Sequence, residues 1–242
     1  MPQGECKFCG NASKLIKAHV IPAGLYDKDD TSQEALMVLS SSRPERVSKS
    51  WTGIYDNQLV CRACENQWDS WDSYAVNFLR HIDQHSKPIT HGNRLIAYQA
   101  DQFDYGRLKL FFLSVAWRCS ASNREEFKLV DLGPYEALLK DAIKTSNPDH
   151  PAGFEITVSR FDDTKLGTIL LNPHCERHGP VNYLRLYMYG YIVLMKTDKR
   201  PGVSPFTDLQ MIRDRPLVIG LREFEGGPEH RLIRRMAKDV QG

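Results

Sequence analysis

Cysteine spacing gives the clearest chemical signal in this sequence. Cys6 and Cys9 form one Cys-x-x-Cys motif, and Cys61 and Cys64 form a second. Zn²⁺ binds four thiolates in a tetrahedron, and a two-residue spacer lets one tight turn supply two of them. In a reducing compartment such paired motifs indicate zinc more often than disulfide bonds. The spacing therefore predicts a structural zinc site made of these four residues, called the zinc clip below.

The zinc clip would close residues 10–60 into a loop and hold any chemistry inside that loop rigidly. Two segments within it stand out, Lys17–Pro22 (KAHVIP) and Tyr55–Val60 (YDNQLV), the second running directly into Cys61. The other two cysteines, Cys119 and Cys175, have no Cys-x-x-Cys partner, and we interpret both as non-ligands.

A His-x-x-Pro segment after the first knuckle, with an asparagine four residues before the second, resembles the HNH family of ββα-metal nucleases. The pattern is most similar to the cysteine-bearing branch related to phage endonuclease VII, and the resemblance covers about residues 5–75. It implies a metal-dependent endonuclease that cuts DNA, or alternatively RNA, in a phage or antiphage setting. It also implies a protein partner or activator that restrains cutting.

The resemblance assigns roles to two side chains in the loop. His19 falls at the general base, which takes a proton from the attacking water, a task suited to an imidazole that titrates near neutrality. Asn57 falls at the middle asparagine, which holds the backbone or ring of the histidine in place.

The position of the catalytic metal ligand on the following helix has two registers. Counting from the middle asparagine selects Asn66, whereas counting from the last cysteine selects Glu65. Asp69 lies one helical turn beyond, on the same face, where its carboxylate could complete an oxygen site for Mg²⁺ or Mn²⁺.

One position departs from the family pattern. The residue before the base is usually Asp or His and binds the catalytic metal, but here it is Ala18. A one-metal nuclease needs that ion to stabilise the phosphate and the leaving oxygen. Two hypotheses therefore stay open: an active endonuclease in which Glu65 or Asp69 compensates, and a catalytically degenerate zinc-binding module that binds nucleic acid or protein.

Net charge does not point to a nucleic-acid-binding protein, since it is only +2 over 242 residues. Local contacts would have to carry such binding. Arg43, Arg46 and Lys49, between the two motif segments, are candidates for phosphate contacts, and the alternative is ordinary solvated loop charge. The arginines of residues 229–238 leave the same two interpretations open.

Hydrophobic periodicity predicts an α+β chain of two domains. Residues 1–100 would be a zinc-clipped ββα-metal (HNH-like) module with its helix. Residues 101–242 would be a substrate- or partner-binding domain of mixed helices and a mainly antiparallel sheet. We expect helices over 65–85, 107–120, 134–145 and 229–238, and strands over 154–159, 166–171, 183–195 (broken at Gly190) and 217–221.

Two further expectations concern the second half. The segment around His174, Cys175 and His178 is flanked by proline and glycine, and we interpret it as a loop. Tyr183, Tyr187, Tyr189 and Tyr191 would line one strand face, with Arg185 on the opposite face.

Composition is that of an ordinary globular protein, with 41% hydrophobic and 26% charged residues. No run of about 18 apolar residues is present, so we expect no membrane-spanning helix and no membrane partner. The first residues lack the basic start and apolar core of a secretory signal, which leads us to expect a cytoplasmic protein.

Overall fold

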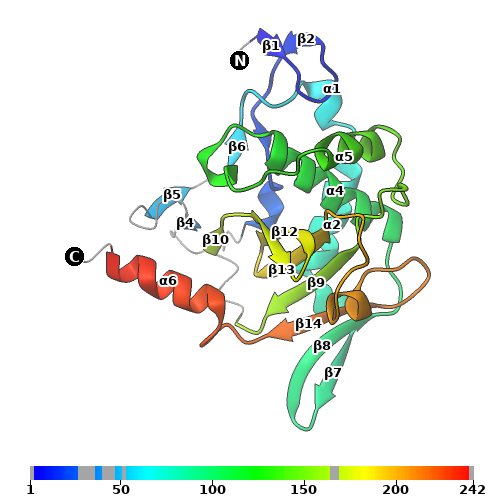
Figure 1. Ribbon diagram of the computed structural model, residues 1–242, viewed down its shortest axis with the longest axis vertical. Helices are drawn as coiled ribbons and strands as arrows, with labels where there is room; N and C mark the ends of the chain where they lie inside the picture. Colours follow the sequence, from blue (N-terminus) through cyan, green and yellow to red (C-terminus); the bar gives the residue numbers. More distant parts are fainter. Residues whose placement is uncertain (1–2, 27–35, 40–46, 51–52, 164–168, 240–242) are drawn as a thin grey trace.

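The computed structural model describes residues 3–26, 36–39, 47–50, 53–163 and 169–239 (Figure 1). Within these ranges the chain is mixed α+β, with one large and mainly antiparallel sheet, as predicted. The HNH-like character of the first third stays a prediction.

The large sheet has seven strands in the order β11-β12-β13-β9-β14-β8-β7. All neighbours are antiparallel except β14 and β9, which are parallel. The strands are β7 (Lys87–His91), β8 (Arg94–Ala100), β9 (Ile156–Phe161), β11 (His174–His178), β12 (Val181–Met188), β13 (Tyr191–Lys196) and β14 (Leu217–Arg222).

The predicted break at Gly190 is a two-residue hairpin turn between β12 and β13. Tyr189 and Gly190 both have positive φ, 50° and 73°, which the twist of a tight β-hairpin favours. A second hairpin, between β7 and β8, was not predicted, although its Gly92-Asn93 turn is a recognised hairpin signal. It projects from the bottom of the view in Figure 1.

Helices pack beside the sheet in the part of the chain that the structure describes. The expected helix over 65–85 is three pieces, α1 (Arg62–Glu65), α2 (Asp69–Arg80) and α3 (Ile82–His85). The other expected helices are confirmed as α4 (Tyr105–Ala121), α5 (Tyr135–Lys144) and α6 (Pro228–Asp239). Short 3₁₀ turns occur at Ala23–Leu25, Glu125–Phe127 and Phe206–Leu209.

Helix α4 is the central helix of the fold. The carboxylate of Asp104 accepts a hydrogen bond from the Arg107 N–H and caps its first turn. Nearly every residue of α4 is buried, and the helix contacts both α2 and α5. None of the helices in the described ranges combines the length and apolar character needed to cross a bilayer.

Three small sheets complete the described structure. Two are antiparallel pairs, β1 (Gln3–Glu5) with β2 (Ala12–Lys14), and β3 (Ala18–His19) with β6 (Tyr55–Asp56). The third has β4 (Leu36–Leu39) between β5 (Val47–Ser50) and β10 (Ile169–Leu171). Because β10 pairs with β4, the loop closed by the zinc clip is joined to the second half of the chain. Figure 1 shows α6 near this third sheet, and Leu232 and Ile233 of α6 pack on a cluster that contains Leu171 of β10.

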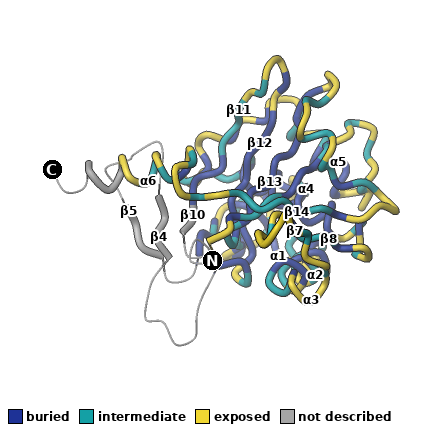
Figure 2. The backbone as a smooth tube through the Cα atoms, turned by 90° about the horizontal axis from the view of Figure 1, so that it is seen from below, coloured by how far each residue is buried: buried dark blue, intermediate teal, exposed yellow. Residues whose placement is uncertain are grey.

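One contiguous hydrophobic core contains residues from both halves, from Phe8 to Ile219. Strands β7 and β8, which precede residue 100, pair onto β14 near the end of the chain. Figure 2 shows buried backbone in the central strands of the large sheet and in α4 beside them. The boundary at residue 100 stays a prediction, and β7 and β8, the two strands directly before it, belong to the large sheet.

Two expectations for the second half are wrong. His174, Cys175 and His178 lie in strand β11 rather than a loop. Arg185 shares a face with Tyr187, since both bond to the Glu229 carboxylate. The reason is the strand period of two, which puts residues of the same parity on one face.

Candidate functional site

The zinc clip is assembled as the sequence predicts. The Sγ atoms of Cys6, Cys9, Cys61 and Cys64 all lie within 4.8 Å of one another. Cys6 and Cys64 are 3.7 Å apart, close to the roughly 3.8 Å edge of a tetrahedron with Zn–S bonds of about 2.3 Å. The donor set and its spacing fit Zn²⁺, so the four residues could hold one zinc ion.

Backbone geometry of the first knuckle prepares Cys6 for a metal. Gly10, with φ of 81°, donates its N–H to the Cys6 carbonyl at 2.7 Å and closes the turn. The Cys61 N–H points at the Cys6 Sγ, 3.4 Å away. Burial raises the pKa of the Cys6 thiol, but the backbone N–H groups of Cys9, Cys61 and Phe8 outweigh burial and lower that pKa from 9.0 to about 7. A thiolate, the form that binds zinc, is therefore favoured here.

The knuckle is embedded in the second half of the chain. Phe8, between the first two cysteines, is 2% exposed and packs edge-on against Trp68 and Trp117, with ring centroids 5.3 and 4.9 Å away. The Lys7 ammonium donates to the Ala121 carbonyl, and the Lys140 ammonium donates to the Lys7 carbonyl. Helices α4 and α5 thus form part of the seat of the zinc clip.

The two motif segments meet in the short β3–β6 ribbon. Ala18 pairs with Asp56, and His19 pairs with Tyr55. The His19 side chain is half-buried, and its ring lies 6.5 Å from that of Tyr55. On the exposed side, the Lys17 ammonium lies 3.6 Å from the centre of the Tyr55 ring. Strand β3, strand β6 and helix α1 occur in the order expected for a ββα motif, with β4 and β5 between the two strands in the sequence.

The candidate metal ligands lie on or near the helices after the ribbon but do not converge. Asn57 is exposed directly after β6, Asn66 is exposed at the end of α1, and Asp69 is exposed at the start of α2. Glu65 is half-buried and forms an ion pair of 2.9 Å with Arg62. Burial raises the pKa of Glu65, and the neighbouring Asp69 and Asp72 carboxylates act in the same direction.

In the described ranges, the zinc clip is the one set of three or more histidine, cysteine or acidic side chains whose ligand atoms lie within 4.8 Å. His19, Glu65 and Asp69 therefore do not form a ready oxygen site for Mg²⁺ or Mn²⁺. Ala18, at the family's usual ligand position, is 1% exposed and has no donor atom. The residues present do not fit a bound catalytic divalent ion in this arrangement.

A salt bridge that sequence reasoning missed joins α4 to α2 next to the β3–β6 ribbon. Both carboxylate oxygens of Asp72 accept from the Arg118 guanidinium, at 2.8 and 2.9 Å. Arg118, on α4, is 1% exposed and also donates to the His19 carbonyl at 3.2 Å. Burial raises the pKa of Asp72, against the opposing charges of Arg118 and His19. The one available signal was a cation near the end of a mostly apolar helix.

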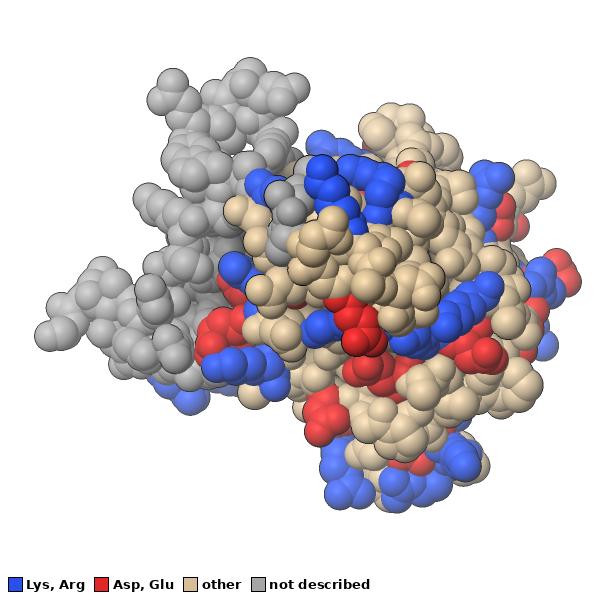
Figure 3. Space-filling model, turned by 90° about the horizontal axis from the view of Figure 1, so that it is seen from above, with Lys and Arg blue, Asp and Glu red and all other residues tan. Residues whose placement is uncertain are grey.

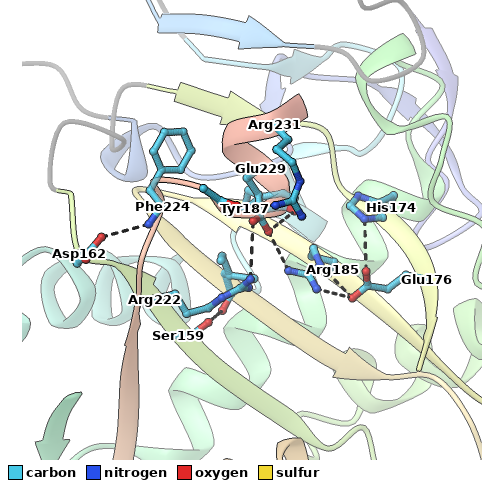
Figure 4. A network of polar contacts seen from close by, with 12 residues as sticks. Ser159, Asp162, His174, Glu176, Arg185, Tyr187, Arg222, Phe224, Glu229 and Arg231 are labelled. Carbon is cyan, nitrogen blue, oxygen red and sulfur yellow. Dashed lines mark hydrogen bonds and ion pairs between the residues drawn. The ribbon is translucent and has the colours of Figure 1, made fainter. Parts of the chain in front are cut away.

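A second buried arginine joins α6 to the large sheet (Figure 4). Arg185 on β12 bonds to the carboxylates of Glu176 at 2.8 Å and Glu229 at 3.1 Å. Burial raises the pKa of Glu176, but His174, Arg185 and His178 outweigh it and hold that pKa well below its usual range. We interpret this cluster as the contact that docks the first turn of α6.

The candidate phosphate contacts are only partly described. Arg43 and Arg46 lie outside the described residues, and the backbone of Lys49 lies in β5 opposite Met37. On α6, Leu232 and Ile233 pack toward the sheet, whereas Arg231, Arg234 and Arg235 are exposed. Figure 3 shows Lys and Arg interspersed with Asp and Glu over the described part of one face, rather than a single-sign field.

Comparisons with protein-family models, with curated proteins and with solved structures found no match to this chain. The HNH likeness thus rests on the motifs and on the arrangement described above.

Proposed function

We propose that this chain is an HNH-like endonuclease that hydrolyses phosphodiester bonds in DNA, or alternatively in RNA. The observation that carries the proposal is the pairing of the two motif segments. His19 lies on a two-stranded ribbon that the zinc clip closes and that two helices follow. A phage or antiphage setting and a restraining protein partner remain part of the proposal, on the resemblance alone.

In this proposal His19 takes the proton of the attacking water. An imidazole is suited to this step because its neutral form is abundant near pH 7. Lys17, two residues before the base, is exposed beside Tyr55. Its ammonium offers a positive charge for the substrate phosphate, and the Tyr55 ring offers a stacking surface for a nucleobase.

No step is assigned to a catalytic metal, because Glu65, Asn66 and Asp69 do not gather into a ligand set with His19. Zinc has a structural role in this proposal, since four protein thiolates leave no open coordination position for substrate.

Exposed arginines of α6 support nucleic acid as the partner. Its inward residues dock on the sheet, so Arg231, Arg234 and Arg235 face outward beside the β4–β5 hairpin that carries Lys49. Such charges bind the phosphate backbone without reading sequence.

The test is incubation of the purified chain with plasmid DNA and with RNA, in Mg²⁺, in Mn²⁺ and in EDTA. The variant His19→Ala removes the proposed base, and His91→Ala, on the exposed β7–β8 hairpin, is the matched control. We expect cleavage that His19→Ala abolishes and His91→Ala leaves intact, and the EDTA arm shows whether that cleavage needs a divalent ion. Cleavage that survives His19→Ala would discard His19 as the base.

A second candidate function is a catalytically degenerate zinc module that binds nucleic acid or protein. Two observations favour it: Ala18 is buried where a ligand is usual, and Asp72 is fully engaged by Arg118. Fluorescence anisotropy with a labelled duplex separates the two candidates. Salt-dependent binding without cleavage in any metal would support the degenerate module.

A further inference from the structure

Arg118 uses all of its hydrogen-bonding capacity at one place. Its guanidinium has five N–H donors. Two go to the Asp72 carboxylate, one to the His19 carbonyl, one to the Ser114 carbonyl and one to the Ser114 hydroxyl, over 2.8–3.3 Å. The guanidinium also lies 5.4 Å from the Trp68 ring. A side chain fixed by six contacts has one conformation. The position of α4 therefore determines where the groups bound by Arg118 lie.

The same end of α4 holds the second strand of the ribbon. Ser122, one helical turn after Arg118, donates from its hydroxyl to the Asp56 carboxylate at 2.7 Å. Asp56 is directly opposite Ala18 in the ribbon. Each strand of the ribbon thus has one hydrogen bond to the C-terminal end of α4, the helix that begins at Tyr105.

We propose that Arg118 is the positioning residue for the His19 base, a role that the family pattern gives to the middle asparagine. This inference rests on the proposed function of the ribbon. It follows from a donor that the pair with Asp72 does not use: an Nη1 N–H of Arg118 bonds to the carbonyl of His19 itself. Asn57, the residue at the asparagine position, is exposed after β6.

Arg118 also fixes the helix that follows the ribbon, because it binds both carboxylate oxygens of Asp72 on α2. A lysine could not reproduce this geometry, since its single ammonium cannot donate in parallel to a carboxylate and reach a carbonyl and a hydroxyl as well.

The experiment must separate positioning from folding, because a single Arg118 variant leaves a buried carboxylate unpaired. The decisive protein is therefore the double variant Arg118→Met/Asp72→Asn, which removes both charges together. Ser122→Ala is the matched control, since it cuts the other bond between α4 and the ribbon without touching His19. Thermal unfolding identifies which variants stay folded.

Two measurements are made on the folded variants. The first is the NMR resonance of the His19 ring, assigned by its loss in His19→Ala, which reports the surroundings of the base without any need for activity. The second is the pH profile of plasmid cleavage. We expect the double variant to shift or broaden the His19 resonance, to alter the pH profile, and to slow cleavage by roughly 10–100-fold. Ser122→Ala should leave the resonance, the pH profile and the cleavage rate close to those of the parent.

A folded double variant whose His19 resonance and cleavage rate match the parent would overturn the proposal. If the double variant unfolds, Arg118→Lys takes its place and is judged by the same two measurements. If the parent protein cleaves nothing, the proposed function fails, and the His19 resonance still decides whether Arg118 positions this side chain.

Discussion

Two cross-links hold the β3–β6 ribbon, and they differ in almost every physical respect. The zinc clip gathers four thiols from two short knuckles, within 4.8 Å of one another. The second cross-link, called the arginine clasp here, is Arg118 with Asp72, Ser114 and His19. The clip depends on a metal ion and on deprotonated ligands, whereas the clasp uses a permanently charged side chain that belongs to the chain itself.

The difference shows how the two halves of the chain depend on each other. All four ligands of the clip lie within the first 64 residues, but Phe8 in its first knuckle packs on Trp117 from α4. The clasp joins residues still farther apart in the sequence, His19 and Arg118. Both cross-links thus contact α4, so the ribbon is not an independent unit within the described structure.

The largest expected effect comes from opening the zinc clip. Cys61→Ser, or removal of zinc by a strong chelator, should abolish the cooperative thermal transition of the whole chain. Structural zinc contributes about 10 kcal/mol or more of binding free energy, comparable to the total stability of a domain. Elemental analysis should find about one zinc per chain, and circular dichroism reports the unfolding.

Cys175→Ser, outside the clip, is the control and should keep both the metal and the transition. Loss of structure confined to residues 3–26 and 53–80, with the large sheet intact, would show that the clip serves the first third alone.

The next largest effect should come from breaking one side of the clasp. Arg118→Met leaves the mostly buried Asp72 carboxylate without its partner and should lower the free energy of unfolding by about 3–5 kcal/mol. Adding Asp72→Asn should recover most of that loss, since no buried charge is then unpaired. Urea unfolding of the parent protein, the single variant and the double variant measures both values. Equal destabilisation of the single and double variants would contradict this account of the pair.

A pH experiment compares the clasp with the second buried arginine, Arg185. The pKa of Glu176 is held low, so its contribution to stability is present above the unfolded value of about 4.3 and is lost as the pH falls below it. Glu176→Gln should lower stability at neutral pH by about 1–3 kcal/mol and flatten this acid-induced loss.

The pH dependence of stability has the opposite sign at Asp72. Burial raises its pKa above the unfolded value, so the folded protein binds this proton more readily than the unfolded chain does. Asp72→Asn should therefore not flatten the acid limb. Urea unfolding between pH 3 and 7 compares the two variants, and an identical pH response would contradict the assignment.

The smallest effect is expected at Ser122, the other bond between α4 and the ribbon. Ser122→Ala removes one hydrogen bond to Asp56 and should cost about 0.5–1.5 kcal/mol. Asp56 keeps its bond from the Gln58 N–H, which limits the loss. A loss as large as that of Arg118→Met would show that the ribbon depends on α4 in general rather than on the clasp.

Sequence reasoning reached the zinc clip because its ligands come in pairs whose spacing is fixed by one turn of backbone. It reached α4 and α5 because their apolar residues recur with helical periodicity. It could not predict the clasp, since no pattern near Asp72 in the sequence indicates Arg118 as its partner. Burial of an arginine is a tertiary fact, and a cation near the end of a mostly apolar helix was its only trace in the sequence.

Strand β11 was missed for a different reason. Its residues, His174 to His178, are mostly polar and lie between a proline and a glycine, which favours a loop. The strand forms because Glu176 meets Arg185 across the sheet and because β11 pairs along its whole length with β12. Local propensity was overridden by cross-strand partners, as is common for sheets.

The seat of Phe8 also bears on how the chain is made. Residues 6–9 leave the ribosome early, but Trp117 is synthesised only after about a hundred further residues, which takes several seconds or more at 5–20 residues per second. Until then Phe8 has only Trp68 of its two tryptophan neighbours. The packing around the first knuckle is therefore completed late in biosynthesis, although its two thiols are among the first residues translated.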